Sequence, residues 1–445
     1  MLQKMANMIL QGDCIGYYFS KGMFNLNTTE NYQVRRKAFY SQFTNFFYDI
    51  EDLEYAIYDV MPIAKEQIEE IKYASNILWK IFTKVSKQFK KLNKEQLISL
   101  GIREEMIPFI DLDYLPQQSV LARFDFILSK SGELKAIELN GDTPFLIQET
   151  FEMNRHLCKE FGFKNPNDDK IVMKSLSAAL FASLEYLKEK KSQPVIVITG
   201  KEEEEDYEEY CHVQFIKRNL PFEVKYVPIS ELRIINESNE HIQKGLYTPD
   251  KQKIDVLYRP AHPIEFLIDD VSNDGDPIGI QLLELIKERE LAIINSPAAY
   301  ILQNKILMAL IWAKKDDPLL YSPEEIQAIN RYMLPTYLSE DVFITNKQPY
   351  VKKPVYSREG NTVEIYKENG SKWYESSYTH YTDNLYVYQQ YIEMPSIEIP
   401  LKEEVAEKKW LIGSFIADNE ACGLSCRLGN AVTEWDSHWA AIGYK

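Results

Sequence analysis

The chain has 445 residues, enough for two or three structural units, and its hydrophobic content of 45% is ample for buried cores. Its 67 acidic residues outnumber the 51 basic ones, and the formal charge of -16 opposes binding to nucleic acid or to an anionic membrane. The same charge favours a cationic small substrate. We therefore expect a globular protein whose partners are small molecules, with no nucleic acid and no membrane; the oligomeric state stays open.

The cysteines do not suggest a disulfide framework, because they are odd in number and scattered along the chain: Cys14, Cys158, Cys211, Cys422 and Cys426. The N-terminal "MLQKMANMILQGDCIGYYF" has no clean apolar core and no small-residue cleavage site. The longest apolar stretch, "SLSAALFASLEYL", is too short to span a bilayer. A reducing, cytoplasmic location is expected.

Residues 1–115 are expected to form a helical region that packs on the rest of the protein. Apolar residues recur at helical spacing in "ILWKIFTKV", from Ile77 to Val85. The segment "IEDLEYAIYDVMPIAKEQIEEIK", residues 50–72, repeats this pattern upstream. We therefore predict helix over both segments.

The stretch "RFDFILSKSGELKAIELNGDTP", residues 123–144, is predicted to be a β-hairpin that reverses at "SKSG". Side chains alternate between the two faces of a strand, so Phe124 and Phe126 face one way, and Ile137 and Leu139 should also lie away from the polar face. That polar face then carries Arg123, Asp125, Glu138 and Asn140.

Such a polar face inside a buried hairpin needs compensation, because an unpaired buried carboxylate costs on the order of several kcal/mol. Carboxylate and amide oxygens are suitable ligands for Mg2+, which also reaches out to substrate phosphates. An internal salt bridge from Arg123 to Asp125 or Glu138 explains the same charges equally well. The residues alone leave both interpretations open.

Residues 193–297 are expected to form a small open, mostly parallel sheet. Short apolar strands alternate with helices in this region, a rhythm typical of α/β units. The expected strands are "PVIVITG", "FEVKYVP", "KIDVLYRP" and "AIINSP", and the expected helices are "EEEEDYEEYCHVQFIKRNL" and "IGIQLLELIKEREL".

The remaining residues, 298–445, begin with a predicted helix, "AAYILQNKILMALIWAKK", that contains Lys305. The strands "YVKKPV", "NTVEIY", "LYVYQQYI" and "LIGSFIADNEACGLSCRL" follow. Lys353 leads into the glycine-containing loop "SREGNTV" with Arg358, a loop suited to closing over phosphates. A lone lysine on a strand, such as Lys353, is usually an edge charge, although the loop with Arg358 favours a phosphate contact. Snorkelling explains Lys305 equally well, and Arg427 is also compatible with a surface ion pair.

Other chemistries fit less well. Cys422 and Cys426 have no second ligand pair nearby, which disfavours zinc, and the adjacent Cys211 and His212 diverge on a helix. No GxGxxG or GxxxxGK[ST] loop follows a strand, which disfavours a Rossmann dinucleotide site or a P-loop. What remains is ATP bound without a P-loop.

In chain order, these hairpin, loop and strand segments resemble the synthetase domain of glutathionylspermidine synthase and its single-domain relatives in the ATP-grasp superfamily. The resemblance covers nearly the whole chain. Bifunctional members of the family carry an additional amidase domain, which this sequence does not supply. It implies an α+β ATP-grasp fold with rearranged motif order, in which residues 116–192 and 298–445 form the core. The parallel sheet of residues 193–297 would be a substrate subdomain, and residues 1–115 an N-terminal helical region.

The resemblance also implies roles for individual residues. The ligands of Mg2+ would be Asp125, Glu138 and Asn140. ATP would be bound by Lys305, Lys353, Arg358, Gln389, Gln390 and Ile392. Arg123 and Arg427 would act on the acyl phosphate, and the substrate would meet Arg123, Asp142, Thr143, Arg259 and Glu265.

The implied activity is an ATP-dependent C–N ligase that activates a peptide-like carboxylate as an acyl phosphate and joins it to an amine, as with glutathione and spermidine. Phe145 departs from the family pattern, because a hydroxyl residue is expected at its position. The identity of the acid is therefore open, and two alternatives remain: a ligase for a different acid and amine, or an inactive ATP-binding scaffold.

Overall fold

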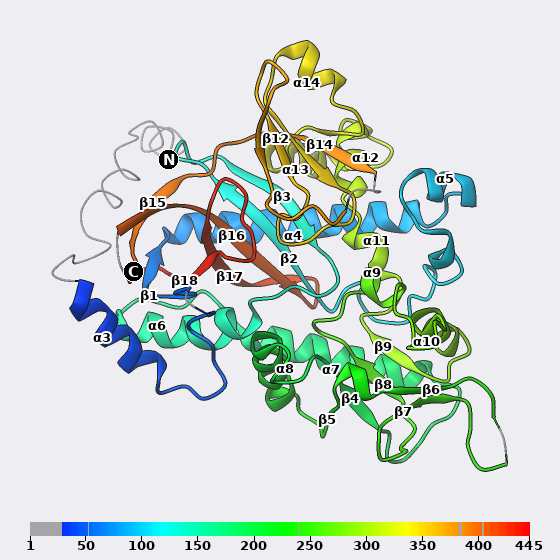
Figure 1. Ribbon diagram of the computed structural model, residues 1–445. Coiled ribbons are helices and arrows are strands. Elements are labelled where there is room, and N and C mark those ends of the chain that lie inside the picture. Colours follow the sequence, from blue (N-terminus) through cyan, green and yellow to red (C-terminus); the bar gives the residue numbers. More distant parts are fainter. Residues whose placement is uncertain (1–28, 52, 239, 382–384, 403–404) are drawn as a thin grey trace.

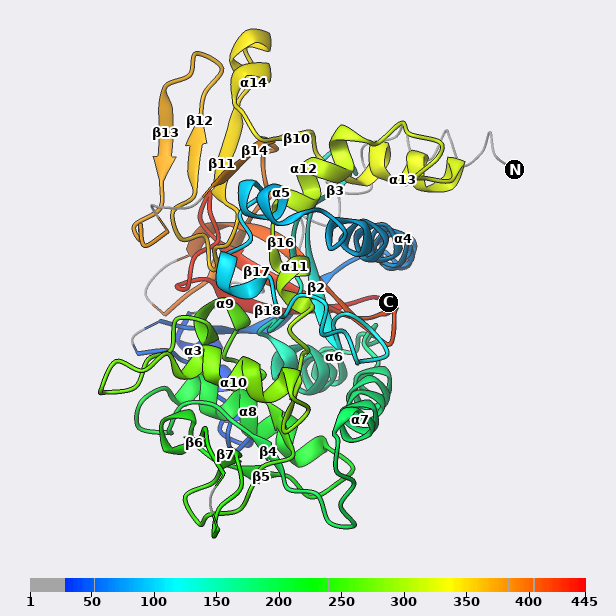
Figure 2. The same cartoon turned by 90° about the vertical axis from the view of Figure 1, so that its right-hand side faces the viewer.

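The computed structural model describes residues 29–445 except 52, 239, 382–384 and 403–404. Cys14 and the N-terminal segment therefore lie outside the described residues. The described part is a mixed α+β structure with two larger sheets, a parallel sheet and a two-stranded ribbon. In Figures 1 and 2 the large sheet lies between the five-stranded sheet and the parallel one.

The large sheet carries the hairpin. Its order is β1-β18-β17-β16-β2-β3, and β15 pairs with β16. The strands are β1 (Ala56–Pro62), β18 (His438–Gly443), β17 (Glu420–Gly429), β16 (Val405–Ala417), β2 (Leu121–Leu128), β3 (Leu134–Asn140) and β15 (Ser396–Pro400). Because β16 pairs with β2, the C-terminal strands continue the sheet directly from the hairpin.

The prediction of helix over residues 50–72 is wrong for its first half. Residues Ala56–Pro62 form β1, which pairs in parallel with β18 at the edge of the large sheet. Most of its residues are buried, and a strand buried on both faces has the same apolar run as a helix segment. Helix α4 begins only at Lys65, after Pro62, and extends to Phe89 as expected.

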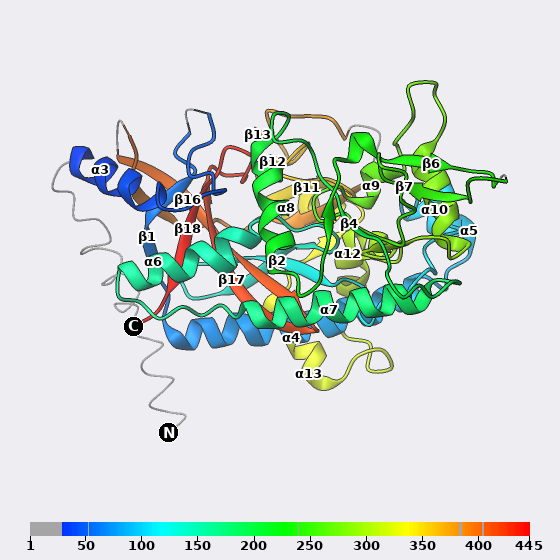
Figure 3. The same ribbon diagram turned by 90° about the horizontal axis from the view of Figure 1, so that it is seen from below.

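Helices cover the large sheet. Both α4 and α7 (Asp169–Tyr186) pack against β16 and β17 (Figure 3). The apolar stripe of α4 includes Ile71, Leu78 and Phe82, all buried, which is the spacing of one helical face. Further helices are α3 (Thr29–Tyr40), α5 (Lys94–Ser99), α6 (Asn154–Glu160) and α13 (Pro323–Tyr332). Among the described residues, no helix is both long and apolar enough to cross a membrane.

The five-stranded sheet is antiparallel and has the order β10-β14-β11-β12-β13. Its strands are β10 (Thr336–Tyr337), β14 (Tyr386–Gln390), β11 (Tyr350–Pro354), β12 (Glu364–Tyr366) and β13 (Lys372–Glu375). Helix α14 (Asp341–Asn346) lies beside it. The sheet projects from the large sheet, with β12 and β13 at its outer side (Figure 2).

The predicted small parallel sheet is present. Its order is β5-β4-β8-β9, and every pair is parallel. The strands are β5 (Lys225–Tyr226), β4 (Ile196–Ile198), β8 (Val256–Tyr258) and β9 (Ala292–Ile294), accompanied by helices α8 (Tyr207–Asn219), α9 (Ile264–Leu267) and α10 (Ile278–Lys287). An antiparallel pair, β6 (Arg233–Ile235) and β7 (Gly245–Tyr247), is a separate ribbon.

The single helix predicted over residues 298–315 is two helices, α11 (Ala299–Gln303) and α12 (Ile306–Ala313). The break lies at Asn304, whose backbone is extended, and Lys305 is the N-cap of α12. The Lys305 amide donates to the carbonyl of Val355 at 2.9 Å, so a tertiary hydrogen bond replaces a helical one. The expectation that Lys305 lies in the middle of a helix is therefore wrong, because Lys305 stands at the start of α12.

Candidate active site

A cavity of about 360 Å³ lies where the hairpin meets the five-stranded sheet and the strands β16 and β17. Most of the residues singled out from the sequence line it: Arg123, Asp125, Glu138, Asn140, Thr143, Lys305, Lys353, Arg358, Gln389, Gln390, Ile392 and Arg427. Asp142, Arg259 and Glu265 are not among its lining residues. Residues more than 300 positions apart in the chain are thus brought into one space.

The hairpin places its polar residues opposite one another. Arg123 pairs with Asn140 and Asp125 pairs with Glu138 across β2 and β3. Arg123 Nε and Nη2 donate to the two oxygens of Asp125 at 2.6 and 3.0 Å. The salt bridge that the sequence left open is therefore formed, and Asn140 Nδ2 lies 3.4 Å from Asp125 Oδ2.

A bulge changes the face of one apolar residue. The strands shift register between Asp125 and Phe126, because Phe126 pairs with Ala136 and leaves Ile137 without a partner. Ile137 was expected on the face opposite Glu138, yet both line the cavity. Ile137 packs on an apolar cluster of Ile127, Met394 and Leu411, which forms an apolar wall.

Two lysines converge on Glu138. Lys305 Nζ lies 3.2 Å from Glu138 Oε1 and donates to the carbonyl of Ser357 at 2.7 Å. Burial opposes ionisation of Glu138, but the charges of Lys305 and Lys353 outweigh burial and hold the pKa of Glu138 below its usual value. The carboxylate is therefore fixed in its ionised form.

Lys353 is buried at the end of β11. Its ammonium donates to the carbonyl of Ile137 at 3.1 Å and to Gln389 Oε1 at 2.8 Å. Burial lowers the pKa of Lys353 to about 8, because the attraction of Glu138 offsets it only in part and Lys305 repels the charge. Such a desolvated cation without a paired anion of its own is suited to a ligand phosphate.

The two arginines expected at the acyl phosphate both lie on the large sheet: Arg123 is on β2 and Arg427 is on β17, with β16 between these strands. Arg427, on β17, donates from Nη2 to the carbonyl of Glu434 at 3.1 Å and to Ser437 Oγ at 3.0 Å. Burial and the nearby charge of Arg123 lower the pKa of Arg427. Within the described residues Arg427 has no carboxylate at ion-pair distance, so its charge is free to meet an anionic ligand.

Arg358 is held by Glu265, which does not line the cavity, and by Thr143, which does. Its Nε donates to Glu265 Oε1 at 2.8 Å and its Nη1 donates to the carbonyl of Thr143 at 3.2 Å. Its Nη2 is buried and has no partner among the described residues, and the same holds for Thr143 Oγ1. The structure therefore joins Arg358 to Glu265, one of the expected substrate residues.

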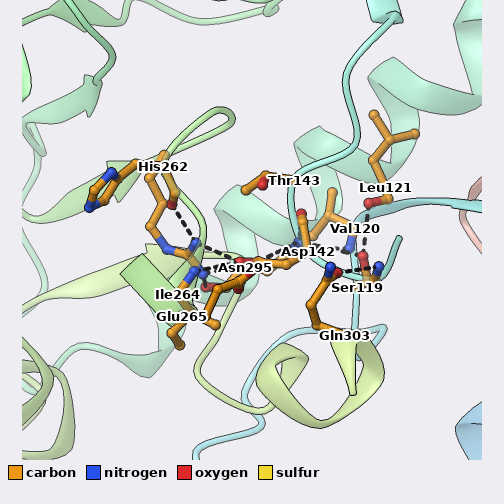
Figure 4. Close-up of polar contacts among 12 residues, drawn as sticks. Ser119, Val120, Leu121, Asp142, Thr143, His262, Ile264, Glu265, Asn295 and Gln303 are labelled. Carbon is orange, nitrogen blue, oxygen red and sulfur yellow. Dashed lines mark hydrogen bonds and ion pairs between the residues drawn. The ribbon is translucent and has the colours of Figure 1, made fainter. Parts of the chain in front are cut away.

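Asp142 and Arg259, which do not line the cavity, form a wholly buried ion pair. Figure 4 shows the polar contacts around Asp142. Arg259 Nη1 and Nη2 donate to the two oxygens of Asp142 at 2.8 and 3.0 Å, and Asp142 also accepts from the Ile264 amide at 2.9 Å. Asn295 Nδ2 donates to the Asp142 carbonyl at 2.6 Å. In this arrangement the pair ties the end of β3 to β8 and α9, and neither side chain faces the cavity.

Sequence reasoning missed several cavity residues. Glu149, Glu208 and Glu359 line the cavity, and so do Tyr55 and His438. Glu208 belongs to the segment 202–220, for which the sequence predicts only a helix. Neighbours in this set are at least 59 positions apart in the chain, and they come together only by packing. Local sequence patterns therefore could not identify them as one group.

The cavity side of the hairpin carries groups of the kind that bind Mg2+. Asp125 and Glu138 are cross-strand neighbours on the cavity side of the hairpin, with the Asn140 amide beside Asp125. Two carboxylates and one amide that line a cavity with two lysines fit a cation shared with ligand phosphates. The residues present therefore fit the ion, with Arg123 and Lys305 in contact with the same carboxylates.

Comparisons with known proteins agree with this architecture. A profile of the family described as glutathionylspermidine synthase preATP-grasp matches residues 29–442. A Haemophilus influenzae protein provisionally named acid–amine ligase is 24% identical over 326 residues, which cover 71% of this chain and 72% of that protein. A glutathione synthetase-like effector from Globodera pallida, solved in its apo form, has a TM-score of 0.55 and 13% identity, covering 93% of this chain and 96% of that one.

Proposed function

Because the chain belongs to the glutathionylspermidine synthase preATP-grasp family, which implies the use of ATP, we propose that it is an ATP-dependent carboxylate–amine ligase. Its product would be an amide between a peptide-like acid and an amine, with glutathione and spermidine as the first pair to test. The acid–amine ligase name of the Haemophilus influenzae relative supports the reaction class. The substrates themselves belong to the proposal.

One observation carries the proposal: a single cavity holds Lys305, Lys353 and Glu138 in mutual reach, with Arg123 and Arg427 alongside. A buried set of cations around two carboxylates is costly to maintain in the absence of a charged ligand. Nucleotide phosphates, together with a divalent cation, satisfy both charge types at once.

The chain's residues would have the following roles. Lys305 and Lys353 hold the phosphates of ATP, while Gln389, Gln390 and Ile392 lie along the cavity wall where the base would rest. Arg123 and Arg427 neutralise the carboxylate and the acyl phosphate formed when the γ-phosphoryl group is transferred. Catalysis then depends on position and charge neutralisation. Bound Mg2+, held by Asp125, Glu138 and Asn140, would neutralise phosphate charge.

The order of these elements supports a rearranged ATP-grasp core. The hairpin with its carboxylates precedes both lysines in the chain, yet β16 joins it to the C-terminal strands in one sheet. The fold likeness to the glutathione synthetase-like effector is consistent with such an arrangement. In the proposal, residues 193–297 form the substrate subdomain.

Phe145 favours a ligase whose acid differs from that of the family's namesake. It lines the cavity and its ring stacks on His212 at a centroid distance of 4.8 Å. The adjacent wall is therefore apolar where a hydroxyl is expected. A different acid and amine pair is the second candidate, and loss of turnover with retained ATP binding is the third.

The test is ADP release by the purified protein with Mg2+ and ATP, measured with glutathione and spermidine added singly and together, and with products weighed by mass spectrometry. Release that requires both substrates and yields a condensed product supports the first pair. Release only with other acids or amines supports the second candidate. ATP-dependent thermal stabilisation without release for any pair contradicts the ligase and supports the scaffold.

A further inference from the structure

The loop between β17 and β18, residues 430–437, lies against the five-stranded sheet and has no role in the site described above. Five of its residues line the cavity: Ala431, Val432, Thr433, Trp435 and Ser437. Glu434 is not among the lining residues and is 7% exposed. Any effect of Glu434 on the chemistry therefore has to pass through the residues that it contacts.

The carboxylate of Glu434 is bound by the outer edge of the five-stranded sheet. The hydroxyl of Tyr374, on β13, donates to Glu434 Oε1 at 3.1 Å. Ser377 follows β13 and donates twice, from its amide to Oε1 at 3.3 Å and from its hydroxyl to Oε2 at 2.9 Å. All three donors are neutral, so the sheet uses this carboxylate as a hydrogen-bond acceptor.

The backbone of the same residue holds Arg427. Arg427 Nη2 donates to the carbonyl of Glu434 at 3.1 Å and to Ser437 Oγ at 3.0 Å. Ser437 Oγ in turn donates to the Glu434 carbonyl at 2.7 Å, which closes a small network. Both acceptors are uncharged, so they orient the guanidinium and leave its charge for a ligand. Glu434 thus joins the sheet to Arg427 through its two ends.

A second, apolar contact fixes the 430–437 loop on the sheet. Val432 belongs to one buried cluster with Val363 and Ile365 at strand β12. Gly360 has a φ of +70°, and a Cβ added there would lie 2.5 Å from Val432 Cγ1. Glycine permits both the left-handed backbone and this close approach. The loop therefore fits closely against the segment that carries Arg358.

The residues that bind Glu434 are also bonded to the loop expected over the phosphates. The amide of Thr362 donates to the carbonyl of Tyr378 at 2.8 Å, and the amide of Tyr381 donates to Thr362 Oγ1 at 3.0 Å. Ser377 directly precedes Tyr378 in the chain. A nucleotide that orders the loop containing Thr362 would therefore also order the donors of Glu434.

We propose that Glu434 is a positioning residue that couples nucleotide binding by the five-stranded sheet to the placement of Arg427. This inference rests on the proposed ligase function, in which Arg427 meets the acyl phosphate. Hydrogen bonds from the sheet fix the side chain of Glu434, and its carbonyl then orients the guanidinium. Because the carboxylate serves as an acceptor, an amide of the same length can replace it: its oxygen accepts as Oε1 does, and its NH2 donates to the Ser377 hydroxyl.

The first experiment measures kcat for ADP release and calorimetric ATP affinity in Glu434→Ala and Glu434→Gln. The control is Glu375→Gln, an exposed carboxylate on β13 that does not line the cavity. We expect kcat to fall about tenfold to a hundredfold in Glu434→Ala and to stay within about threefold of wild type in the other two. ATP affinity should change less than about threefold in all three, because the nucleotide lysines do not touch Glu434.

Two results overturn the positioning role. Unchanged kcat in Glu434→Ala shows that Arg427 needs no help from this residue. An equal loss in Glu434→Gln and Glu434→Ala shows that the negative charge matters and not the hydrogen bonds. Ser377→Ala removes one donor without touching the 430–437 loop, and it should lower kcat in the same direction even if Glu434→Ala folds poorly.

The second experiment needs no turnover. Hydrogen exchange is followed by mass spectrometry in the peptides 374–381 and 430–437 of the full chain, with and without ATP and Mg2+. We expect ATP to slow exchange in both peptides of the wild type but only in 374–381 of Glu434→Ala. Slowing of both peptides in Glu434→Ala, or of neither or only the first in the wild type, overturns the coupling. Linked protection in a wild-type chain that releases ADP with no acid overturns the ligase and supports the coupling.

Discussion

At the scale of single residues, the site depends on charges that compensate one another. Glu138 stays ionised because Lys305 and Lys353 outweigh its burial, and Asp125 is bound by Arg123. These pairs compensate part of the buried charge around the hairpin, whereas Lys353 and Arg427 have no carboxylate at ion-pair distance among the described residues. Removal of one of these charges would therefore leave its partner buried without compensation.

Glu138→Gln should abolish turnover and leave the fold intact. Loss of one preorganised electrostatic contact costs roughly 10²- to 10³-fold in rate, and here Lys305 loses its ion-pair partner as well. ADP release and far-UV circular dichroism measure the two effects. Glu133→Gln removes an exposed carboxylate from the same hairpin and serves as the control. Wild-type activity in Glu138→Gln would remove that residue from the site.

Lys353→Met should abolish ATP binding, because this buried ammonium donates only to a carbonyl and an amide and so has charge to offer a phosphate. The neighbouring Lys352→Met is a matched control: Lys352 pairs with Glu364 at 2.9 Å and does not line the cavity. Calorimetric titration with ATP and Mg2+ compares the two. Equal affinities in both variants would contradict the nucleotide assignment.

At the scale of elements, the alternation of the hairpin was predictable but its surroundings were not. Period-two alternation identified Arg123, Asp125 and Glu138 as one face, since that pattern is local. The bulge at Ile137, the strand β1 and the helix break at Asn304 depend on partners distant in the chain. Local sequence carries no signal for such contacts, so these features could not be predicted.

Gly413→Ala should lower turnover with little loss of stability. Gly413 on β16 lies opposite Asp125, and an added Cβ would lie 2.8 Å from Arg123 Cδ. The side chain of Arg123 has to move, and its two hydrogen bonds to Asp125 are disturbed. Turnover is measured as ADP release that requires the carboxylic acid substrate, and stability is measured as the denaturation midpoint. A variant with unchanged turnover would show that the position of Arg123 is not critical.

Asp142→Asn should destabilise the chain by about 3 to 5 kcal/mol, because it leaves the wholly buried Arg259 guanidinium without its anion. Chemical denaturation gives the free energy of unfolding. The double variant with Arg259→Met should be less destabilised than the sum of the single variants, because it removes both charges. Strict additivity would mean that the pair does not tie the end of β3 to α9.

At the scale of the whole molecule, the cavity exists because separate sheets meet. The hairpin supplies carboxylates, the five-stranded sheet supplies Lys353 and Gln389, and the start of α8 in the parallel-sheet unit supplies Glu208. The family resemblance made the first two sets predictable, whereas the position of Glu208 needed the packed structure. The division of the chain into four ranges stays a prediction.

ATP with Mg2+ should stabilise the whole chain, because a ligand that binds only the folded state adds about 2.7 kcal/mol at one hundred times its Kd. The thermal unfolding midpoint should therefore rise with ATP concentration in the wild type and in Lys352→Met. It should stay flat in Lys353→Met. A rise of equal size in Lys353→Met would place the nucleotide elsewhere.

The most direct test of carboxylate activation follows oxygen. The acid that supports ADP release is labelled with 18O in its carboxylates, and the released phosphate is weighed by mass spectrometry. We predict one labelled oxygen in each phosphate, because the carboxylate oxygen stays with phosphorus when the amine displaces it. Unlabelled phosphate, or ADP release that no acid stimulates, would contradict acyl phosphate formation in this cavity.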